Sequence, residues 1–180
     1  LQKQGARTVY WKTGHSYMKR RTHELKALAG FEKSGHFFFN APIGRGYDDG
    51  LVSAIAVCEM LDRAPGKTMA DLKDALPKTW SSPTMSPHCA DETKYGIVTQ
   101  VVKHFEDVKA KGGKVAGQPI RDLVTVNGVR VTCEDGSWGL VRASNTQPVL
   151  VMRFEAQSEA RLAEIRREVE DAVSAIRAAG

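Results

Sequence analysis

The sequence predicts an α/β unit followed by an α+β unit. Strand and helix patterns alternate within residues 1–82, which is typical of an α/β layer. Residues 97–180 instead contain one helix pattern, a group of closely spaced strand patterns and a second helix pattern. We therefore expect a mixed α/β domain, and after it a four-stranded antiparallel sheet with helices on one face.

The first unit is expected to contain strands at residues 7–12 and 36–39 and helices at about residues 16–29 and 48–63. The apolar spacing of Met18, Leu25 and Leu28 indicates the first helix. Asp48 and Asp49 indicate the start of the second, because carboxylates are favoured at the positive amino end of a helix.

A stretch rich in serine, threonine and proline joins the two units. It covers residues 79–87 and favours an extended connection over a helix. We expect the first domain to cover residues 1–82, a hinge to lie at residues 83–96, and the C-terminal domain to cover residues 97–180.

In the second unit, an amphipathic helix is predicted because apolar residues share one helical stripe: Val98, Val101, Val102, Phe105 and Val108. Two glycines at 112–113 end it. The Asn-Gly pair at 127–128 lies between valines and predicts a hairpin. Further strands are expected at about 137–142 and 148–155, and a last helix from Ser158.

The composition is that of a globular protein. Hydrophobic residues make up 42% and charged residues 26% of the 180. No apolar run approaches the roughly 20 residues that a membrane helix needs, so no membrane contact is expected. Residues 1–5 are polar and lack an initiator methionine, so we expect the start to be an interior point of a longer chain.

The three cysteines are scattered and form no C-x-x-C pair. An odd, scattered set argues against a disulfide framework and favours a reducing, cytoplasmic setting. Buried structural thiols are expected at Cys58 and Cys133 in preference to reactive ones.

The net charge of +5 is concentrated at one end of the chain. Residues 1–50 hold nine Lys or Arg and four Asp or Glu, whereas the remaining residues hold seventeen of each. Such a bias can serve nucleic acid or a small anionic ligand. The aromatic residues Phe37, Phe38 and Phe39 cluster instead of alternating with basic residues, which disfavours a nucleic-acid partner.

The loop at residues 142–148 carries the densest group of anion-binding side chains. Arg142 offers a planar fork of donors for phosphate oxygens, and neutral donors follow at Ser144, Asn145 and Thr146. Ser and Asn also bond routinely to their own backbone in turns. The residues alone therefore leave open whether this is an anion site or an ordinary turn.

Two segments of the first unit are also candidates. Glu32 and Ser34 lie close together before a strand, and a carboxylate with a hydroxyl suits neighbouring sugar hydroxyls. Solvated loop charges are the alternative. His15 follows a strand end and begins a helix, where it can meet an anion, work in acid–base chemistry or simply cap the helix.

Together, four segments resemble the α-D-phosphohexomutases in order and spacing. They are T-G-H-S at 13–16, E-K-S-G-H at 32–36, D-D-G at 48–50 and R-A-S-N-T-Q-P at 142–148. The resemblance covers nearly the whole chain. It implies that residues 1–82 are an incomplete third domain of the mutases and that residues 97–180 are their fourth domain.

The resemblance also implies roles for single residues. Glu32 and Ser34 would bind the hydroxyls at sugar carbons 3 and 4. The phosphate that is not transferred would be held by Arg142, Ser144, Asn145 and Thr146. His15 would contact the ligand, and His36 is a candidate for ligand contact or proton transfer.

The family's phosphoserine and its magnesium-binding D-G-D loop belong to the first and second mutase domains, and neither motif occurs here. The resemblance thus implies no catalytic serine and no metal ligand in this chain. Mg²⁺ would bind in the missing N-terminal domains, which are the expected partner. One departure from the family pattern is Phe31, where the mutases often have glycine before the glutamate.

The implied reaction interconverts hexose 1-phosphate and 6-phosphate through a 1,6-bisphosphate, which would also serve as activator. The resemblance therefore implies that the whole protein is a phosphomannomutase/phosphoglucomutase, and that this chain would bind hexose phosphates but be inactive alone. A non-catalytic phosphosugar-binding fragment or homologue is the alternative. Both loops would close on one ligand, so weak binding by the chain alone is expected.

Overall fold

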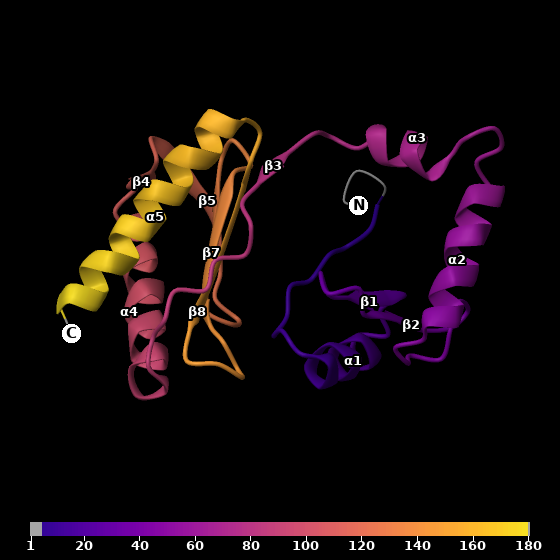
Figure 1. Cartoon of the computed structure of the whole chain (residues 1–180), viewed down its shortest axis with the longest axis horizontal. Coiled ribbons are helices and arrows are strands. Elements are labelled where there is room, and N and C mark those ends of the chain that lie inside the picture. Colours follow the sequence, from indigo (N-terminus) through magenta and orange to yellow (C-terminus); the bar gives the residue numbers. More distant parts are fainter. Residues whose placement is uncertain (1–4, 180) are drawn as a thin grey trace. The chain divides into compact units, whose positions relative to one another are not determined.

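A computed structural model describes residues 5–179 and divides the chain into two compact units, Leu1–Pro77 and Lys78–Gly180 (Figure 1). Residues 1–4, where we expect an interior point of a longer chain, and residue 180 lie outside the described residues. The predicted fold class, α/β followed by α+β, is confirmed. Within residues 5–179, no helix is long and apolar enough to cross a membrane.

Unit 1 contains three helices and a two-stranded antiparallel sheet within its described residues. They are α1 (His15–Glu24), β1 (Ala29–Phe31), β2 (Phe37–Phe39), α2 (Gly50–Asp62) and α3 (Met69–Asp74). In the sheet, Gly30 of β1 lies opposite Phe38 of β2. The predicted strand at 36–39 and the helix expected from Asp48 are therefore confirmed, the latter with Asp49 as its N-cap.

One strand and one helix end of unit 1 were predicted wrongly, and one short helix was not predicted. Residues 7–12 form no strand, because no described strand lies beside them to complete a ladder. The helix predicted to reach Ala29 ends at Glu24, since the chain turns at Lys26 with φ of 48° and enters β1. The short helix α3 was missed, although Thr68 and Asp71 form a capping box at its start.

Unit 2 is a six-stranded sheet in the order β3-β8-β7-β6-β5-β4, with two helices. Its elements are β3 (Trp80–Ser81), α4 (Asp91–Ala110), β4 (Lys114–Val115), β5 (Gln118–Val124), β6 (Val129–Cys133), β7 (Trp138–Ala143), β8 (Leu150–Ala156) and α5 (Glu159–Ala179). The four predicted strands are β5 to β8, all antiparallel, and the short strands β3 and β4 lengthen the sheet at its edges.

Both long helices of unit 2 cover the same face of the sheet (Figure 1). Between helices and sheet lies a continuous core, to which α4 contributes Val101 and Phe105 and α5 contributes Ile165 and Val169. Phe154 of β8 is fully buried among them. Burial of these apolar side chains is the main term that stabilises the unit.

Residues 83–96, for which we predict a hinge, run along the sheet of unit 2 for part of their length. Met85 bridges to Met152 and His88 to Val149, and residues from Asp91 onward belong to α4. The hinge itself stays a prediction.

Candidate functional site

In unit 1, the predicted sugar-binding residues belong to the tight turn between β1 and β2. The backbone N–H of Gly35 donates to the carbonyl of Glu32, and the N–H of Glu32 donates to the carbonyl of His36, both at 3.0 Å. Gly35 has φ of 93°, a conformation that glycine adopts without steric cost. The sequence E-K-S-G-H therefore places Glu32, Ser34 and His36 on one short loop.

The start of α1 meets this loop directly. The backbone N–H of Gly14 donates to Glu32 Oε1 at 2.7 Å. One carboxylate oxygen of Glu32 is thus tied to the residue before His15, and this contact joins two of the predicted segments. Ser34 is exposed, and no hydrogen bond of its hydroxyl is found to any other described residue.

A third segment joins them through Asp48. Asp48 Oδ2 lies 2.6 Å from His36 Nδ1, and Asp48 Oδ1 accepts from the backbone N–H of Phe37 at 3.2 Å. His15 Nε2 lies 3.7 Å from the same Oδ2. The two imidazole rings are nearly perpendicular, with centroids 5.9 Å apart. The structure therefore gathers His15 and His36 around one carboxylate.

These contacts favour the ionised form of Asp48. The hydrogen bond with His36 lowers the pKa of the Asp48 carboxyl, partial burial opposes this, and the Phe37 amide and the charges of His36 and His15 lower it further. Its side chain is 26% exposed, against 45% for His36 and 51% for His15. The carboxylate is thus the more shielded partner of two solvent-accessible imidazoles.

Asp48 is a candidate site residue to which the sequence analysis gave no role of its own. We assigned the pair Asp48 and Asp49 to the helix start, but only Asp49 caps α2, accepting from the N–H groups of Leu51 and Val52. A helix needs one N-cap side chain. The second carboxylate was therefore a signal that the sequence offered and we did not use.

In unit 2, Ser144 shapes the loop between β7 and β8. Its Oγ accepts from the backbone N–H of Thr146 at 3.3 Å and of Gln147 at 3.2 Å, and its own N–H donates to the carbonyl of Val149 at 3.0 Å. The side chain is buried. Ser144 therefore forms the serine turn that we weighed against an anion site, and its O–H remains a donor.

Two contacts from outside the loop fix its far end. Lys94 of α4 is buried, and its ammonium donates to the carbonyl of Gln147 at 3.0 Å while it pairs with Asp91 at 2.6 Å. The bond to Asp91 raises the pKa of Lys94 against the effect of burial. The N–H of Cys89 donates to the carbonyl of Pro148 at 2.8 Å. The loop is thus rigidly attached to the sheet and to α4.

Arg142 is the half-buried cation of this loop. Its Nη1 donates to the carbonyl of Ala143 at 3.1 Å. Gly128, in the hairpin turn, packs so closely on β7 that an added Cβ would lie 2.2 Å from the carbonyl oxygen of Val141 and 2.8 Å from the Cα of Arg142. Asn145 and Thr146 are exposed at the loop tip. The guanidinium of Arg142, the amide of Asn145 and the hydroxyl of Thr146 therefore lie at and just after the end of β7, where Gly128 packs closely against the strand.

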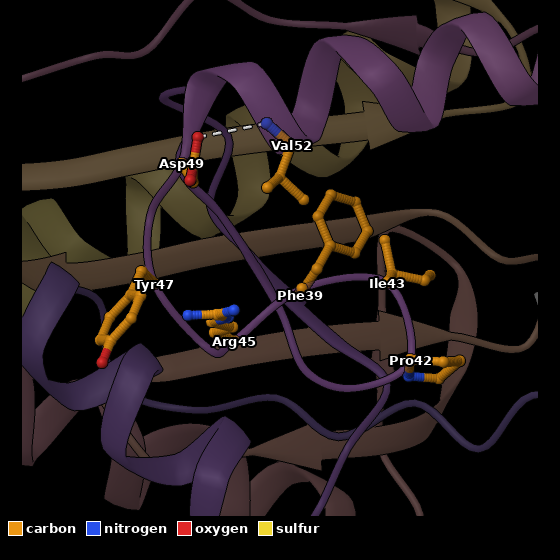
Figure 2. Close-up of a pocket in the computed structure, with 8 residues that line it drawn as sticks. Phe39, Pro42, Ile43, Arg45, Tyr47, Asp49 and Val52 are labelled. Carbon is orange, nitrogen blue, oxygen red and sulfur yellow. Dashed lines mark hydrogen bonds between the residues drawn. The ribbon is translucent and has the colours of Figure 1, made fainter.

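A separate pocket of about 470 Å³ lies in unit 1, between the end of β2 and the start of α2 (Figure 2). It is lined by Phe39, Pro42, Ile43, Gly44, Arg45, Tyr47, Asp49 and Val52. None of the predicted site residues lines it. Figure 2 shows Asp49 bonded to the first turn of α2, so the helix end there already has its own carboxylate.

No group of three His, Cys, Asp or Glu side chains suited to a metal ion is found within residues 5–179. All three cysteines are free. Cys133 is buried as predicted, and burial raises the pKa of its thiol. Cys58 is exposed, so its predicted burial was wrong: α2 has no buried residue in the described part of unit 1.

Comparison with known proteins identifies relatives of both units. Residues 1–80 match the family model for phosphoglucomutase/phosphomannomutase, alpha/beta/alpha domain III, and residues 89–172 match that for the C-terminal domain. The phosphomannomutase/phosphoglucomutase of Pseudomonas syringae pv. tomato is 40% identical over 166 residues, which cover 92% of this chain and 33% of that protein. The phosphoglucomutase of Neisseria gonorrhoeae is 32% identical over a similar span.

A solved structure is also similar. The crystal structure of a phosphoglucomutase/phosphomannomutase family protein from Burkholderia thailandensis matches 98% of this chain and 34% of its own, with a TM-score of 0.79 and 33% sequence identity. The chain thus spans about a third of the length of the relatives that it matches.

Proposed function

The chain belongs to the phosphoglucomutase/phosphomannomutase family, and on this premise we propose that it is the substrate-binding C-terminal portion of a phosphohexomutase. The whole protein would interconvert the 1- and 6-phosphates of mannose or glucose through a 1,6-bisphosphate. The phosphoserine that donates the phosphoryl group would lie outside this chain, in a domain of the whole protein other than domain III and the C-terminal domain.

The observation that carries this proposal is the difference in chemistry between the two loops. The loop of Glu32 and Ser34 offers a carboxylate and an exposed hydroxyl, which suit a pair of neighbouring sugar hydroxyls. We propose that these two side chains bind the hydroxyls at carbons 3 and 4. Mannose and glucose agree at those carbons, so the loop would accept both sugars.

The second loop would hold the phosphate that is not being transferred. Arg142 supplies a charged fork of donors, and Ser144, Asn145 and Thr146 add neutral ones. Because the Ser144 oxygen accepts from two amides of its own loop, its remaining contribution to a ligand is its O–H. The buried ammonium of Lys94 holds the Gln147 carbonyl in place, and Asp91 balances its charge.

The two histidines complete the proposed ligand contacts. His15 would bind an oxygen of the ligand, and His36 would bind ligand or carry a proton. Their side chains are about half exposed, so both are accessible to a solute.

Magnesium is expected because of the family relationship alone. When bound, Mg²⁺ would stabilise charge on the transferring phosphoryl group. The described residues offer no set of ligands that fits it, so we place it outside this chain and derive no step through it. A glucose 1,6-bisphosphate-type intermediate would act as activator, and the cytoplasm would be the site of action.

Calorimetric titration of the chain with glucose 6-phosphate tests the ligand assignment. We expect weak but measurable binding, and a loss of about tenfold or more in affinity for Arg142→Ala, since a hydrogen bond to a charged group contributes about 1.5–3 kcal/mol. Arg121→Ala is the matched control, because Arg121 is also on the sheet of unit 2 but exposed. Unchanged binding by Arg142→Ala would remove the phosphate assignment.

An activity assay separates a catalytic parent from a binding protein. The chain alone should not isomerise glucose 1-phosphate, whereas the full-length protein that contains it should. Turnover by the chain alone would contradict the placement of the phosphoserine elsewhere. A full-length protein that binds hexose phosphate without turnover would favour the non-catalytic alternative.

A further inference from the structure

The contacts of Asp48 lead beyond the residues to which the family resemblance gives a role. Both histidines proposed to meet the ligand face this one carboxylate, at 2.6 Å from His36 Nδ1 and 3.7 Å from His15 Nε2. Only the first distance is that of a hydrogen bond. Asp48 therefore orients His36 directly, and attracts His15 by charge when His15 is protonated.

We propose that Asp48 is a positioning residue that fixes the tautomer of His36, so that Nδ1 keeps its proton and Nε2 is presented to the substrate as the proton-accepting nitrogen. The proposal rests on the proposed function for the identity of the substrate. It assigns a role in that reaction to Asp48, which belongs to the D-D-G segment but had been given no role there, and which does not cap α2.

The hydrogen-bond inventory around Asp48 fixes the direction of the proton. An ionised carboxylate can only accept, so the 2.6 Å contact requires the proton to be on His36 Nδ1. The other oxygen of Asp48 already accepts from the Phe37 amide, which anchors the carboxylate beside β2. His36 Nε2 has no hydrogen-bond partner among the described residues. A neutral His36 held this way has its lone pair on Nε2.

The chemical use of this arrangement is a single proton transfer. As a sugar hydroxyl attacks phosphorus, its O–H bond breaks and the proton moves to Nε2. The hydroxyl oxygen forms the new bond to phosphorus. The bond between phosphorus and the oxygen of the phosphoserine breaks, and its electron pair stays on that serine oxygen. Asp48 would stabilise the imidazolium that results, as a carboxylate behind a catalytic histidine does in hydrolases.

Asp48→Asn is a sharp test because the structure fixes how the amide must sit. The Phe37 N–H needs an acceptor, so the amide oxygen of asparagine must take the position of Oδ1. The position of Oδ2, which faces His36 Nδ1, is then taken by the amide nitrogen. That nitrogen donates a proton and cannot accept one. His36 Nδ1 must then accept, and its proton moves to Nε2.

The first readout is the tautomer of His36, from nitrogen-15 spectra of the 180-residue chain at about pH 9, well above the ordinary imidazole pKa. The wild-type chain should show a protonated Nδ1, and Asp48→Asn a protonated Nε2. Asp49→Asn is the matched control, because it removes the same charge one residue away and asparagine still caps α2. A protonated Nε2 in the wild type, or an unchanged tautomer in Asp48→Asn, would overturn the proposal.

The second readout is turnover by the full-length protein that contains this chain. Asp48→Asn should lower kcat about 100-fold or more, with KM changed by less than about threefold, since proton transfer by a positioned group contributes at least that much. Asp49→Asn should keep wild-type turnover. Full activity of Asp48→Asn, or an equal loss in Asp49→Asn, would contradict the role. If the wild type does not isomerise hexose phosphates, the proposed function fails, while the tautomer still decides the Asp48–His36 arrangement.

Discussion

The two units differ in how they hold their proposed binding loops. Unit 2 has a continuous core against one face of its sheet, and the loop at residues 142–148 connects strands β7 and β8 of that sheet. In the described part of unit 1, Phe38 is the buried hydrophobic side chain, and α2 presents apolar residues such as Leu51, which is 72% exposed. The loop of unit 1 is positioned by hydrogen bonds between short segments, whereas the loop of unit 2 is positioned by hydrogen bonds and also joins two strands of a packed sheet.

The two loops therefore depend on different contacts. The Ser144 loop is fixed from three sides, by its own serine turn, by Lys94 and by the backbone of Cys89. The Glu32 loop depends on the Gly14 amide and on the contact between Asp48 and His36. The loop at residues 142–148 should therefore respond both to core packing and to its polar supports, whereas the loop at residues 32–36 should respond mainly to single polar groups.

The largest expected effect is on the stability of unit 2. Phe154→Ala removes a fully buried ring from the core and should lower the free energy of unfolding of unit 2 by about 3–5 kcal/mol. Leu51→Ala in α2 should change stability by less than about 0.5 kcal/mol, because its side chain is exposed. Urea titration combined with hydrogen exchange measures both, and equal losses would erase the contrast between the units.

A polar cluster at the opposite end of unit 2's sheet gives the next effect. Burial raises the pKa of the Asp135 carboxyl, but hydrogen bonds from Ser137 and the ion pair with Arg161, at 2.6 Å, lower it to below its ordinary value of 3.8. Because the pKa of Asp135 is lower in the folded state, its ionised form stabilises the folded unit at pH values above the pKa of the unfolded state. This stabilisation is lost as the pH falls through the folded-state pKa.

Asp135→Asn should therefore cost about 1–2 kcal/mol at neutral pH, and the variant should lose less stability than the wild type as the pH falls below about 4. Glu134→Gln is the control, since Glu134 is its exposed neighbour. Thermal unfolding followed from pH 7 to pH 2.5 measures the difference. Parallel curves for wild type and Asp135→Asn would show that this pair does not support the unit.

The smallest expected effect is on ligand affinity, after a change to a contact that supports the loop at residues 142–148. Lys94→Met removes the ammonium that holds the Gln147 carbonyl and keeps a long apolar side chain. Glucose 6-phosphate affinity should fall by about threefold to tenfold, because the loop must be ordered again on binding, and amide exchange should quicken at residues 144–148. Lys103→Met, an exposed change on the same helix, should leave both unchanged. Slow exchange in Lys94→Met would show that the serine turn alone fixes the loop.

Sequence reasoning predicted unit 2 better than unit 1 for the same physical reason. Patterns such as the Asn127 hairpin and the apolar stripe of α4 reflect a core that the unit contains, so periodicity and burial agree. In unit 1, the pattern at residues 7–12 has the composition of a strand, but no described strand pairs with it. The edge strands β3 and β4 were missed because two residues carry no period.

The site shows a similar limit. The loops around Glu32 and Arg142 could be proposed from the sequence because several candidate binding residues lie within a few positions of one another. Asp48 lies twelve residues from His36, so only the fold brings them together. Lys94 lies fifty-three residues from Gln147 and was not foreseen for the same reason. Spacing along a chain reveals local sets, and long-range pairs need the structure.

The central claim is that one loop binds the sugar and the other the phosphate, and amide chemical shifts of the whole chain test it most directly. Glucose 6-phosphate should shift the signals of residues 32–36 and 142–146 together. Inorganic phosphate at the same concentration should shift residues 142–146 alone, in the wild type and not in Arg142→Ala. Shifts from glucose 6-phosphate that spare either loop, or equal shifts of both loops by inorganic phosphate, would contradict the division of labour that we propose.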